Sequence, residues 1–445
     1  MNTASPSRQA PAWVARLPFF YGWVVIAIAF ITMAIGVNAR TAFSLLYPPI
    51  LEEFGWSRGV TAAAFSIGFF ASAAYAPMIG AMMDRWGPRI VISLSAILVA
   101  AGLVLTTVIS EPWQLYATLG VLVVGGSLGM AYTGHGAFVP RWFERKRGFA
   151  IGIAFSGVGL GAVVMFPWMQ ALIDGGGWRT ACWAVALLVL VVVVPLNLAL
   201  QRQDPSELGL RPDGDAAPPP LAAGQAAAVP ANVVDRAWAA TDWTLARAVR
   251  TARFWWLIGG FVSGMFTWYL VMVHQTQFLI DIGISRERAA LALGVVPLFG
   301  VIGQIGLGHL SDRIGREWGW TIGCLGFVIC YATLIAMKSH PSMALLALMV
   351  ISQGVLGYAM TPNYGSIPAE IFQGAHYGAI FGWLSVSTAV GASAGPWIAG
   401  LIYDGTGSYD IAFMLGLAAA VLSSFCIWMA SPRKVRSVAG RIGRA

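Results

Sequence analysis

The chain has 445 residues, of which 58% are hydrophobic and only 10% are charged, and its formal net charge is +8. Average soluble domains carry about 25% charged residues, so a water-soluble globule is excluded, and the abundant apolar side chains exclude a disordered chain. The four cysteines lie in apolar stretches without metal-ligand spacing, which excludes a disulfide scaffold and a metal site. The composition predicts a polytopic membrane protein.

Twelve apolar runs are long enough to cross a bilayer, which takes about 20 residues per helix. We therefore expect an all-α membrane protein with twelve transmembrane helices. No removable signal peptide is expected, because Arg8 and Arg16 are not followed by a short apolar segment with a small-residue cleavage site. The approximate limits of the spans are 20–47, 59–82, 90–109, 114–139, 149–173, 180–200, 254–280, 289–310, 318–337, 343–367, 377–402 and 409–430.

The basic residues predict the orientation of these spans. With both termini in the cytoplasm, 21 of the 27 lysines and arginines fall in cytoplasmic segments, five fall in outer loops, and Arg40 alone lies inside a span. This asymmetry matches the positive-inside rule. We expect a multi-pass protein of the cytoplasmic or inner membrane, with the bilayer as its surroundings and no nucleic-acid partner, because the basic residues act as topological anchors.

A loop motif recurs after 228 residues. It reads Gly-Ala-Met-Met-Asp-Arg-Trp-Gly-Pro-Arg at 80–89 and Gly-His-Leu-Ser-Asp-Arg-Ile-Gly-Arg at 308–316. A constant offset over several loops predicts two pseudosymmetric six-helix halves, 20–200 and 254–430. The remaining segments are an N-tail (1–19), a cytoplasmic linker (201–253) and a basic cytoplasmic tail (431–445). Within the linker, Ala216–Pro230 has a flexible composition, and a short basic surface helix is expected over 242–253.

The Gly-x-x-x-Asp-Arg-x-Gly loop of both halves resembles the signature of the major facilitator superfamily. Tyr21-Gly22-Trp23, the basic segment 141–147 and the glycine-rich stretch 148–161 resemble its monocarboxylate porter and oxalate–formate antiporter branch. The resemblance implies the major facilitator fold and a gate latch at the loop motifs; the alternative is a plain turn with anchoring charges. The latch residues would be Asp84, Arg85, Arg89, Asp312, Arg313 and Arg316.

Two small-residue patterns, Gly157-x-x-x-Gly161 and Gly391-x-x-x-Gly395, predict close helix packing.

Arg40 is the only lysine or arginine inside an apolar span, where a cation is costly and usually functional. On a helix it shares a face with Gly36, Ser44 and Tyr47, which forms a polar stripe. Because a guanidinium binds a carboxylate through two hydrogen bonds, this site predicts a small organic anion as cargo. The alternative is that Arg40 extends to the outer interface.

Further polar residues are candidates for the same site. Tyr132 and His135 lie three residues apart on the fourth span and share a face. The offset relates His135 to Asn363 and Tyr47 to Gln275, which follows His274, so pseudosymmetry predicts two pairs across a central cavity. For each histidine the alternative is a hydrogen-bonded core side chain.

All 19 acidic residues lie in loops, tails or span ends, and Glu370 is expected at a solvated helix end. Proton coupling would therefore depend on His135, His274 or the carboxyl group of the cargo. Proton-linked relatives have an Arg on helix 8 with an Asp one turn earlier, where this chain has Gln304 and Gly300. Oxalate–formate exchangers add a Lys on helix 11, which this chain lacks. Binding of a monoanion is retained, and Gln304 remains a candidate for the site.

The sequence thus predicts a secondary transporter of small, monocarboxylate-like organic anions that works by alternating access, with protons or a counter-anion as coupled species. The alternative is an exporter of neutral or lipophilic molecules. No phosphate-binding loop is present and no cofactor is expected. An enzyme is disfavoured because the five histidines are scattered, and a sensor is disfavoured because no signalling domain is recognisable.

Overall fold

The apolar runs form long helices in the computed structural model, which describes residues 14, 16–215 and 231–441. The described residues contain ten helices that are long and apolar enough to span a membrane. Two of these are broken, because Gly87 (φ 73°) interrupts α4 (Arg58–Thr106) and Gly177 (φ 78°) interrupts α7 (Arg147–Leu188). Such positive φ angles favour glycine. Each break divides one long helix into two spans, so the predicted twelve-helix membrane fold is confirmed.

The first six-helix half contains an irregular fourth span. Its first span is formed by α2 (Gly22–Thr41) and α3 (Phe43–Phe54), and its second and third spans by α4. The fifth and sixth spans come from α7, η4 (Val189–Val193) and α8 (Val194–Leu200). The fourth span is a series of short elements: α5 (Pro112–Leu115), η1 (Tyr116–Gly125), η2 (Gly126–Met130), α6 (Tyr132–Phe138) and η3 (Val139–Arg141).

The second half repeats this pattern, and its irregular span is again the fourth. That span is built from α14 (Met343–Ile351), η7 (Ser352–Leu356), η8 (Gly357–Ala359) and α15 (Met360–Ile371). The other spans of this half are α11 (Ala252–Asp281), α12 (Arg286–Ile314), α13 (Arg316–Ser339), α16 (Tyr377–Thr406) and α17 (Asp410–Ala430).

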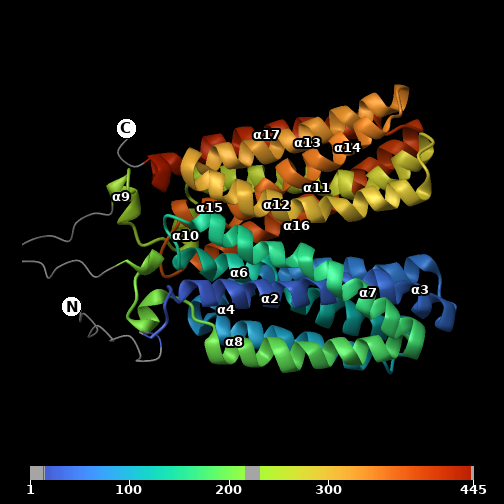
Figure 1. Cartoon of the computed structure of the whole chain (residues 1–445), viewed down its shortest axis with the longest axis horizontal. Coiled ribbons are helices and arrows are strands. Elements are labelled where there is room, and N and C mark those ends of the chain that lie inside the picture. Colours follow the sequence, from blue (N-terminus) through green and yellow to red (C-terminus); the bar gives the residue numbers. More distant parts are fainter. Residues whose placement is uncertain (1–13, 15, 216–230, 442–445) are drawn as a thin grey trace, which may run out of the picture.

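The two halves lie side by side, blue to green and yellow to red in Figure 1. The start of α2, the linker helices and the end of α17 gather at one end of the bundle, which we call the linker side. The opposite end, where α3 lies, is the far side, and the two halves diverge toward it (Figure 1).

Both small-residue patterns lie where helices of the same half meet. A Cβ atom on Gly161 of α7 would lie 2.6 Å from the carbonyl oxygen of Ala34 in α2. In the second half, a Cβ atom on Gly395 of α16 would lie 2.5 Å from the carbonyl oxygen of Phe266 in α11. Because glycine lets the backbones approach this closely, the predicted packing role is confirmed.

On the linker side, short segments outside the spans pack over the helix ends of each half. In the first half, Asp213 accepts hydrogen bonds from the backbone N–H groups of Glu144 (3.0 Å) and Arg145 (2.9 Å). In the second half, the N–H of Val234 donates to the carbonyl of Val435 at 2.9 Å, which joins the linker to the C-terminal tail. The short helices of these segments are η5 (Pro205–Leu208), η6 (Pro212–Gly214), α9 (Arg236–Ala239), α10 (Leu245–Ala248), η9 (Pro432–Lys434) and η10 (Ala439–Arg441).

The linker differs from its prediction in one respect. The basic helix expected over 242–253 is reduced to the single turn of α10, because Thr251 ends this segment by capping the first turn of α11. The proline- and alanine-rich stretch 216–230 lies outside the described residues.

Candidate functional site

Arg40 lies in the last turn of α2, just before the irregularity at Ala42 that separates α2 from α3. Its side chain is half-buried, and its guanidinium carbon lies 4.3 Å from the centre of the Phe69 ring on α4. No described carboxylate forms an ion pair with it, and the groups that interact with it electrostatically are the hydroxyls of Tyr132 and Tyr269. Arg40 is therefore a half-buried cation inside the bundle without a carboxylate partner among the described residues.

A group of three tyrosines from both halves includes the two that interact with this cation. Tyr132 begins α6 in the first half, whereas Tyr269 on α11 and Tyr358 in η8 come from the second half. The three hydroxyls interact electrostatically with one another, and each side chain is half-buried although it lies within the bundle. Tyr269 and Tyr358 were missed in the sequence.

The irregular spans explain how these tyrosines reach the site. Ala131 has an extended backbone (φ −98°, ψ −167°), so the helix restarts at Tyr132 and its side chain is presented at the start of a turn. The equivalent position in the second half, Ala359, ends η8 directly after Tyr358. Broken helices of this kind are tolerated in a bilayer where they line a cavity.

His135 and Asn363 occupy equivalent places but do not bond each other. His135 Nδ1 lies 3.1 Å from the carbonyl oxygen of Ala131, and Asn363 Nδ2 donates to the carbonyl of Ala359 at 2.8 Å. Both side chains are fully buried, and His135 Nε2 and Asn363 Oδ1 lack a hydrogen-bond partner. The pseudosymmetry is therefore retained, but each side chain bonds its own helix.

The remaining candidates are spread along the spans. Ser44 is exposed and donates to the carbonyl of Thr41 at 3.0 Å, while Tyr47 packs 5.9 Å from the ring of Phe43. Gln275 and Gln304 are buried, and neither the amide of Gln275 nor Oε1 of Gln304 has a hydrogen-bond partner. The predicted pairing of Tyr47 with Gln275 is therefore absent as a hydrogen bond.

His274 is engaged within the second half. Its Nδ1 lies 3.1 Å from the Tyr409 hydroxyl, and its Nε2 lies 2.9 Å from the carbonyl oxygen of Pro396. Both ring nitrogens are thus occupied, which matches the structural alternative for this histidine.

On the linker side, two carboxylates connect the halves. Asp84 at the turn of α4 accepts hydrogen bonds from the N–H groups of Gly378 (2.9 Å) and Ala379 (2.7 Å), which begin α16, and pairs with Arg141 at 2.8 Å. The negative carboxylate is stabilised at the positive end of the helix dipole. We call this contact the Asp84 latch.

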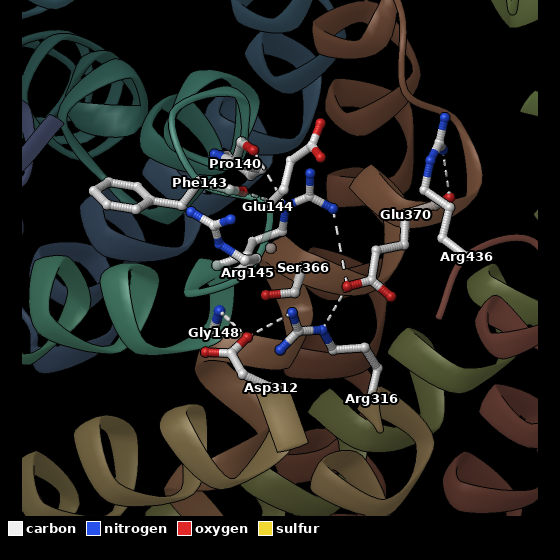
Figure 2. A network of polar contacts seen from close by, with 12 residues as sticks. Pro140, Phe143, Glu144, Arg145, Gly148, Asp312, Arg316, Ser366, Glu370 and Arg436 are labelled. Carbon is white, nitrogen blue, oxygen red and sulfur yellow. Dashed lines mark hydrogen bonds and ion pairs between the residues drawn. The ribbon is translucent and has the colours of Figure 1, made fainter. Parts of the chain in front are cut away.

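The equivalent Asp312 latch is more deeply buried and contains four charges, of which Figure 2 labels Asp312, Arg316 and Glu370. Asp312 accepts hydrogen bonds from the N–H groups of Gly148 (2.8 Å) and Phe149 (2.9 Å) at the start of α7. Arg316 pairs with Asp312 at 2.7 Å and with Glu370 at 2.6 Å, and Arg147 of the first half lies 3.9 Å from Glu370. The four side chains are only 1–5% exposed. Two positive and two negative charges therefore compensate one another almost without water.

The C-terminal tail reaches this latch. Arg436 donates to the backbone carbonyl of Glu370 at 2.8 Å (Figure 2). Burial and the neighbouring Arg147 lower the pKa of the Arg436 guanidinium, while the charges of Glu370 and Glu144 act in the opposite direction.

Glu370 corrects an expectation from the sequence. It was expected at a solvated helix end but is 4% exposed and lies at the centre of the Asp312 latch. Its position at the end of an apolar span gave no sign of this, because its partners Arg316 and Arg147 come from α13 and α7.

Three other expected latch residues lie on the surface. Arg85 is exposed and lies 5.9 Å from the Trp86 ring, and Arg89 donates to the carbonyl of Leu198 at 2.8 Å. Arg313 is exposed as well. None of the three side chains is hydrogen-bonded or ion-paired across the halves in the described ranges.

On the linker side, glycine residues allow the backbones of the two halves to come into contact. A Cβ atom on Gly308 would lie 2.5 Å from the carbonyl oxygen of Gly148, and one on Gly378 would lie 2.6 Å from that of Gly80. Side chains other than hydrogen do not fit at these distances. The backbones of the two halves thus contact each other directly on the linker side.

The family model described as Major Facilitator Superfamily matches residues 23–337 and 257–444. The chain belongs to this superfamily. The predicted superfamily is confirmed, and the protein is an integral multi-pass membrane protein and a transporter, not an enzyme.

Relatives of this major facilitator protein carry transporter names. Monocarboxylate transporter 12 of Rattus norvegicus is 26% identical over 432 residues, which cover 93% of this chain and 86% of the relative. Monocarboxylate transporter 11 of Homo sapiens is 26% identical over 425 residues, covering 94% and 84%.

Solved structures of the superfamily share the fold. FucP in the outward conformation aligns with a TM-score of 0.63 at 15% identity and covers 92% of this chain and 98% of its own. The human organic anion transporter MFSD10 aligns with a TM-score of 0.66 at 17% identity and covers 93% and 100%. At these identities the likeness concerns the fold alone.

Proposed function

We propose that the protein is a secondary transporter of small organic anions of the monocarboxylate type, with Arg40 as the carboxylate anchor. The observation that carries this proposal is the half-buried guanidinium of Arg40, which has no carboxylate partner among the described residues. A buried cation without a counter-charge is unfavourable, so an anionic cargo supplies the missing charge. The names of the monocarboxylate transporters among its relatives support the same cargo class.

The cargo is held by groups from both halves. Arg40 binds the carboxylate through two hydrogen bonds, and the hydroxyls of Tyr132, Tyr269 and Tyr358 are the neutral donors beside it. Because Tyr132 belongs to one half and the other two tyrosines to the other, a cargo bound here contacts both halves. It can therefore respond to their relative movement.

The linker side is proposed to be the cytoplasmic side, since 21 of the 27 lysines and arginines lie in the segments assigned to it. On that orientation both termini are cytoplasmic, and the closed latches make this conformation outward-facing. Alternating access requires both latches to open while the far side closes.

The charges near Arg40 determine how transport of the cargo can be coupled to a second ion. The described residues contain no carboxylate beside Arg40, so the protein has no acidic relay at the anchor. The charge of Arg40 is compensated when the cargo binds, and exchange for a second anion or co-transport of a proton with the cargo carboxyl then allows the cycle to close.

An exporter of neutral or lipophilic molecules is the rival function. The half-buried aromatic rings of Phe69, Trp268 and Tyr358 near the anchor favour it, because they offer apolar contact to an uncharged molecule. The charge of Arg40 separates the two functions, since an uncharged cargo has no use for a guanidinium.

The experiment is uptake into proteoliposomes of labelled mono- and dicarboxylates, with and without a pH gradient. Wild type and the exposed-surface control Arg250→Gln are expected to take up a monocarboxylate, and Arg40→Gln is expected to lose this uptake. Uptake without dependence on the gradient, stimulated by an anion on the opposite side, assigns exchange. If Arg40→Gln transports every acid at the wild-type rate, or if only neutral dyes move, the proposed function is wrong.

A further inference from the structure

A row of aromatic rings leads from Arg40 toward the far side. The Arg40 guanidinium lies 4.3 Å from the Phe69 ring, and Phe65 packs edge-on against Phe69 at 4.8 Å. Phe43 then stacks on Phe65 at 5.1 Å and lies 5.9 Å from Tyr47. Because Tyr47 follows Arg40 toward the far side on the first span and α4 returns beside it, the row extends outward from the cation.

The second half contains a second group of aromatic rings. Trp268 of α11 packs 4.7 Å from Tyr358 and 5.2 Å from Phe327, and Tyr269 follows it directly along the helix. Trp268, Tyr269 and Tyr358 are half-buried, as are Phe65 and Phe69 in the first half. The tyrosines of this group are those that interact electrostatically with Tyr132, and Tyr269 also interacts with Arg40, which connects this group with the cation.

Arg40 supplies one uncompensated positive charge to this site. The buried arginines of the Asp312 latch are compensated by carboxylates, and Arg40 has none within the described part of the chain. One guanidinium accommodates one carboxylate. A second negative charge on the cargo would lie against aromatic rings without a partner, and burial of an unpaired charge is unfavourable.

We propose that the cargo is an aromatic monocarboxylate, whose carboxylate binds Arg40 and whose ring packs between Phe69 on one half and Tyr358 on the other. This inference rests on the anion transport proposed above and narrows its cargo class. A ring of the cargo fills the space between aromatic side chains with offset or edge-on contacts, whereas a short aliphatic acid leaves those faces in contact with water. The tyrosine hydroxyls remain available for a polar substituent on the ring.

The first test compares five ligands in competition with labelled benzoate uptake by wild-type proteoliposomes. Benzoate is expected to compete about tenfold better than acetate, and cyclohexanecarboxylate to lie between them, because it supplies apolar area without a π face. Terephthalate, which adds a second carboxylate, and benzamide, which has none, are expected to compete at least tenfold more weakly than benzoate.

The second test separates the ring contacts from the anchor. Phe69→Leu is expected to weaken competition by benzoate about tenfold while leaving acetate within about twofold, and Tyr358→Leu, which also removes a hydroxyl, is expected to weaken benzoate more than acetate. Phe70→Leu is the matched control, since Phe70 neighbours Phe69 but is 72% exposed on the outer face of α4. Arg40→Gln is expected to weaken both acids.

The outcomes distinguish the aromatic cargo from the anion transport on which this inference rests. Equal competition by benzoate and acetate on wild type overturns the aromatic cargo and leaves anion transport standing. Equal loss of both acids in Phe69→Leu and Tyr358→Leu also overturns it, because the rings would then act only on the fold. If none of the acids is transported and neutral dyes are, the proposed function itself is rejected. The wild-type panel decides the inference even if a variant does not fold.

Discussion

Arg316 Nε donates to Oε1 of Glu370 at 2.6 Å in a position where both side chains are at most 5% exposed. The pair belongs to the second half, yet through Arg147 and Asp312 it continues into the first half. The Asp84 latch has no such network, because Arg141 is 17% exposed and is its only cationic partner among the described ion pairs. The two pseudosymmetric latches are thus unequal, and the Asp312 latch has the greater share of desolvated charge.

The first prediction concerns this pair. Glu370→Gln removes the carboxylate that Arg147 faces and one of the two that pair with Arg316, and removal of one partner from a buried ion pair costs about 3–5 kcal/mol. We expect a matching loss of thermal stability in detergent. The four free cysteines are all buried, so a thiol-reactive dye reports unfolding directly.

Two comparisons make this measurement specific. The double variant Arg316→Met/Glu370→Met is expected to recover part of the loss, because it removes both charges together. Glu53→Gln breaks the Glu53–Arg179 pair, whose side chains are 41–42% exposed, and is expected to cost at most about 1 kcal/mol. A melting midpoint of Glu370→Gln equal to that of wild type would contradict the buried network.

The second prediction concerns backbone contact between the halves. An alanine at Gly308 would bring its Cβ to 2.5 Å from the carbonyl oxygen of Gly148, so Gly308→Ala is expected to hold the linker side open. Ile151, which is fully buried, becomes the reporter as Ile151→Cys. In Gly308→Ala this cysteine should react rapidly with a membrane-impermeant maleimide supplied from the linker side, and transport should fall to the background.

Gly306→Ala is the matched control for that variant. Gly306 lies on the same helix two residues away, and a Cβ atom there meets no other atom within 4 Å. Its labelling and transport should equal those of the parent. If Gly308→Ala stays as protected as Gly306→Ala, the glycine contact does not control opening.

Part of this architecture could be predicted from the sequence, because the information is local. The 228-residue offset predicted two halves, and the resemblance of the loop motifs implied a latch at Asp84 and Asp312, whose carboxylates accept hydrogen bonds from N–H groups at the start of α16 and α7. The length of a span is read directly from its apolar run, and the position of a turn is read directly from its motif. Neither prediction requires knowledge of the residues that pack against the segment.

The missed residues depend on partners distant in the chain. Glu370 is 54 residues from Arg316, and a carboxylate at a helix end is indistinguishable in sequence from a solvated one. Tyr269 interacts with Arg40, and Tyr358 interacts with Tyr132 and Tyr269, because the spans are placed by packing and because helix geometry changes at η8. Hydropathy does not record such a change, since the residues remain apolar on either side of it.

The third prediction separates charge from geometry at the anchor. Arg40→Lys keeps a positive charge but loses the planar fork that binds a carboxylate through two hydrogen bonds. We expect the KM for a monocarboxylate to rise about tenfold, because one charge-assisted hydrogen bond is worth about 1.5–3 kcal/mol, part of which the ammonium restores. Arg40→Gln should show no saturable uptake. Equal KM values for Arg40→Lys and Arg40→Gln would mean that the charge itself contributes nothing.

The last prediction concerns the C-terminal tail. The backbone N–H of Arg433 donates to Oε1 of Glu317 at 3.0 Å, and Glu317 is 2% exposed. Truncation after Ser431 removes this donor together with Arg436, so a buried carboxylate loses its partner, at a cost of about 1–3 kcal/mol. The dye-monitored melting midpoint should fall accordingly. Adding Glu317→Gln to the truncated chain should raise it again, since a neutral amide needs no counter-charge, whereas the same substitution in the full chain should lower it. A truncated chain that responds to Glu317→Gln as the full chain does would show that the tail stabilises the protein by packing and not through this carboxylate.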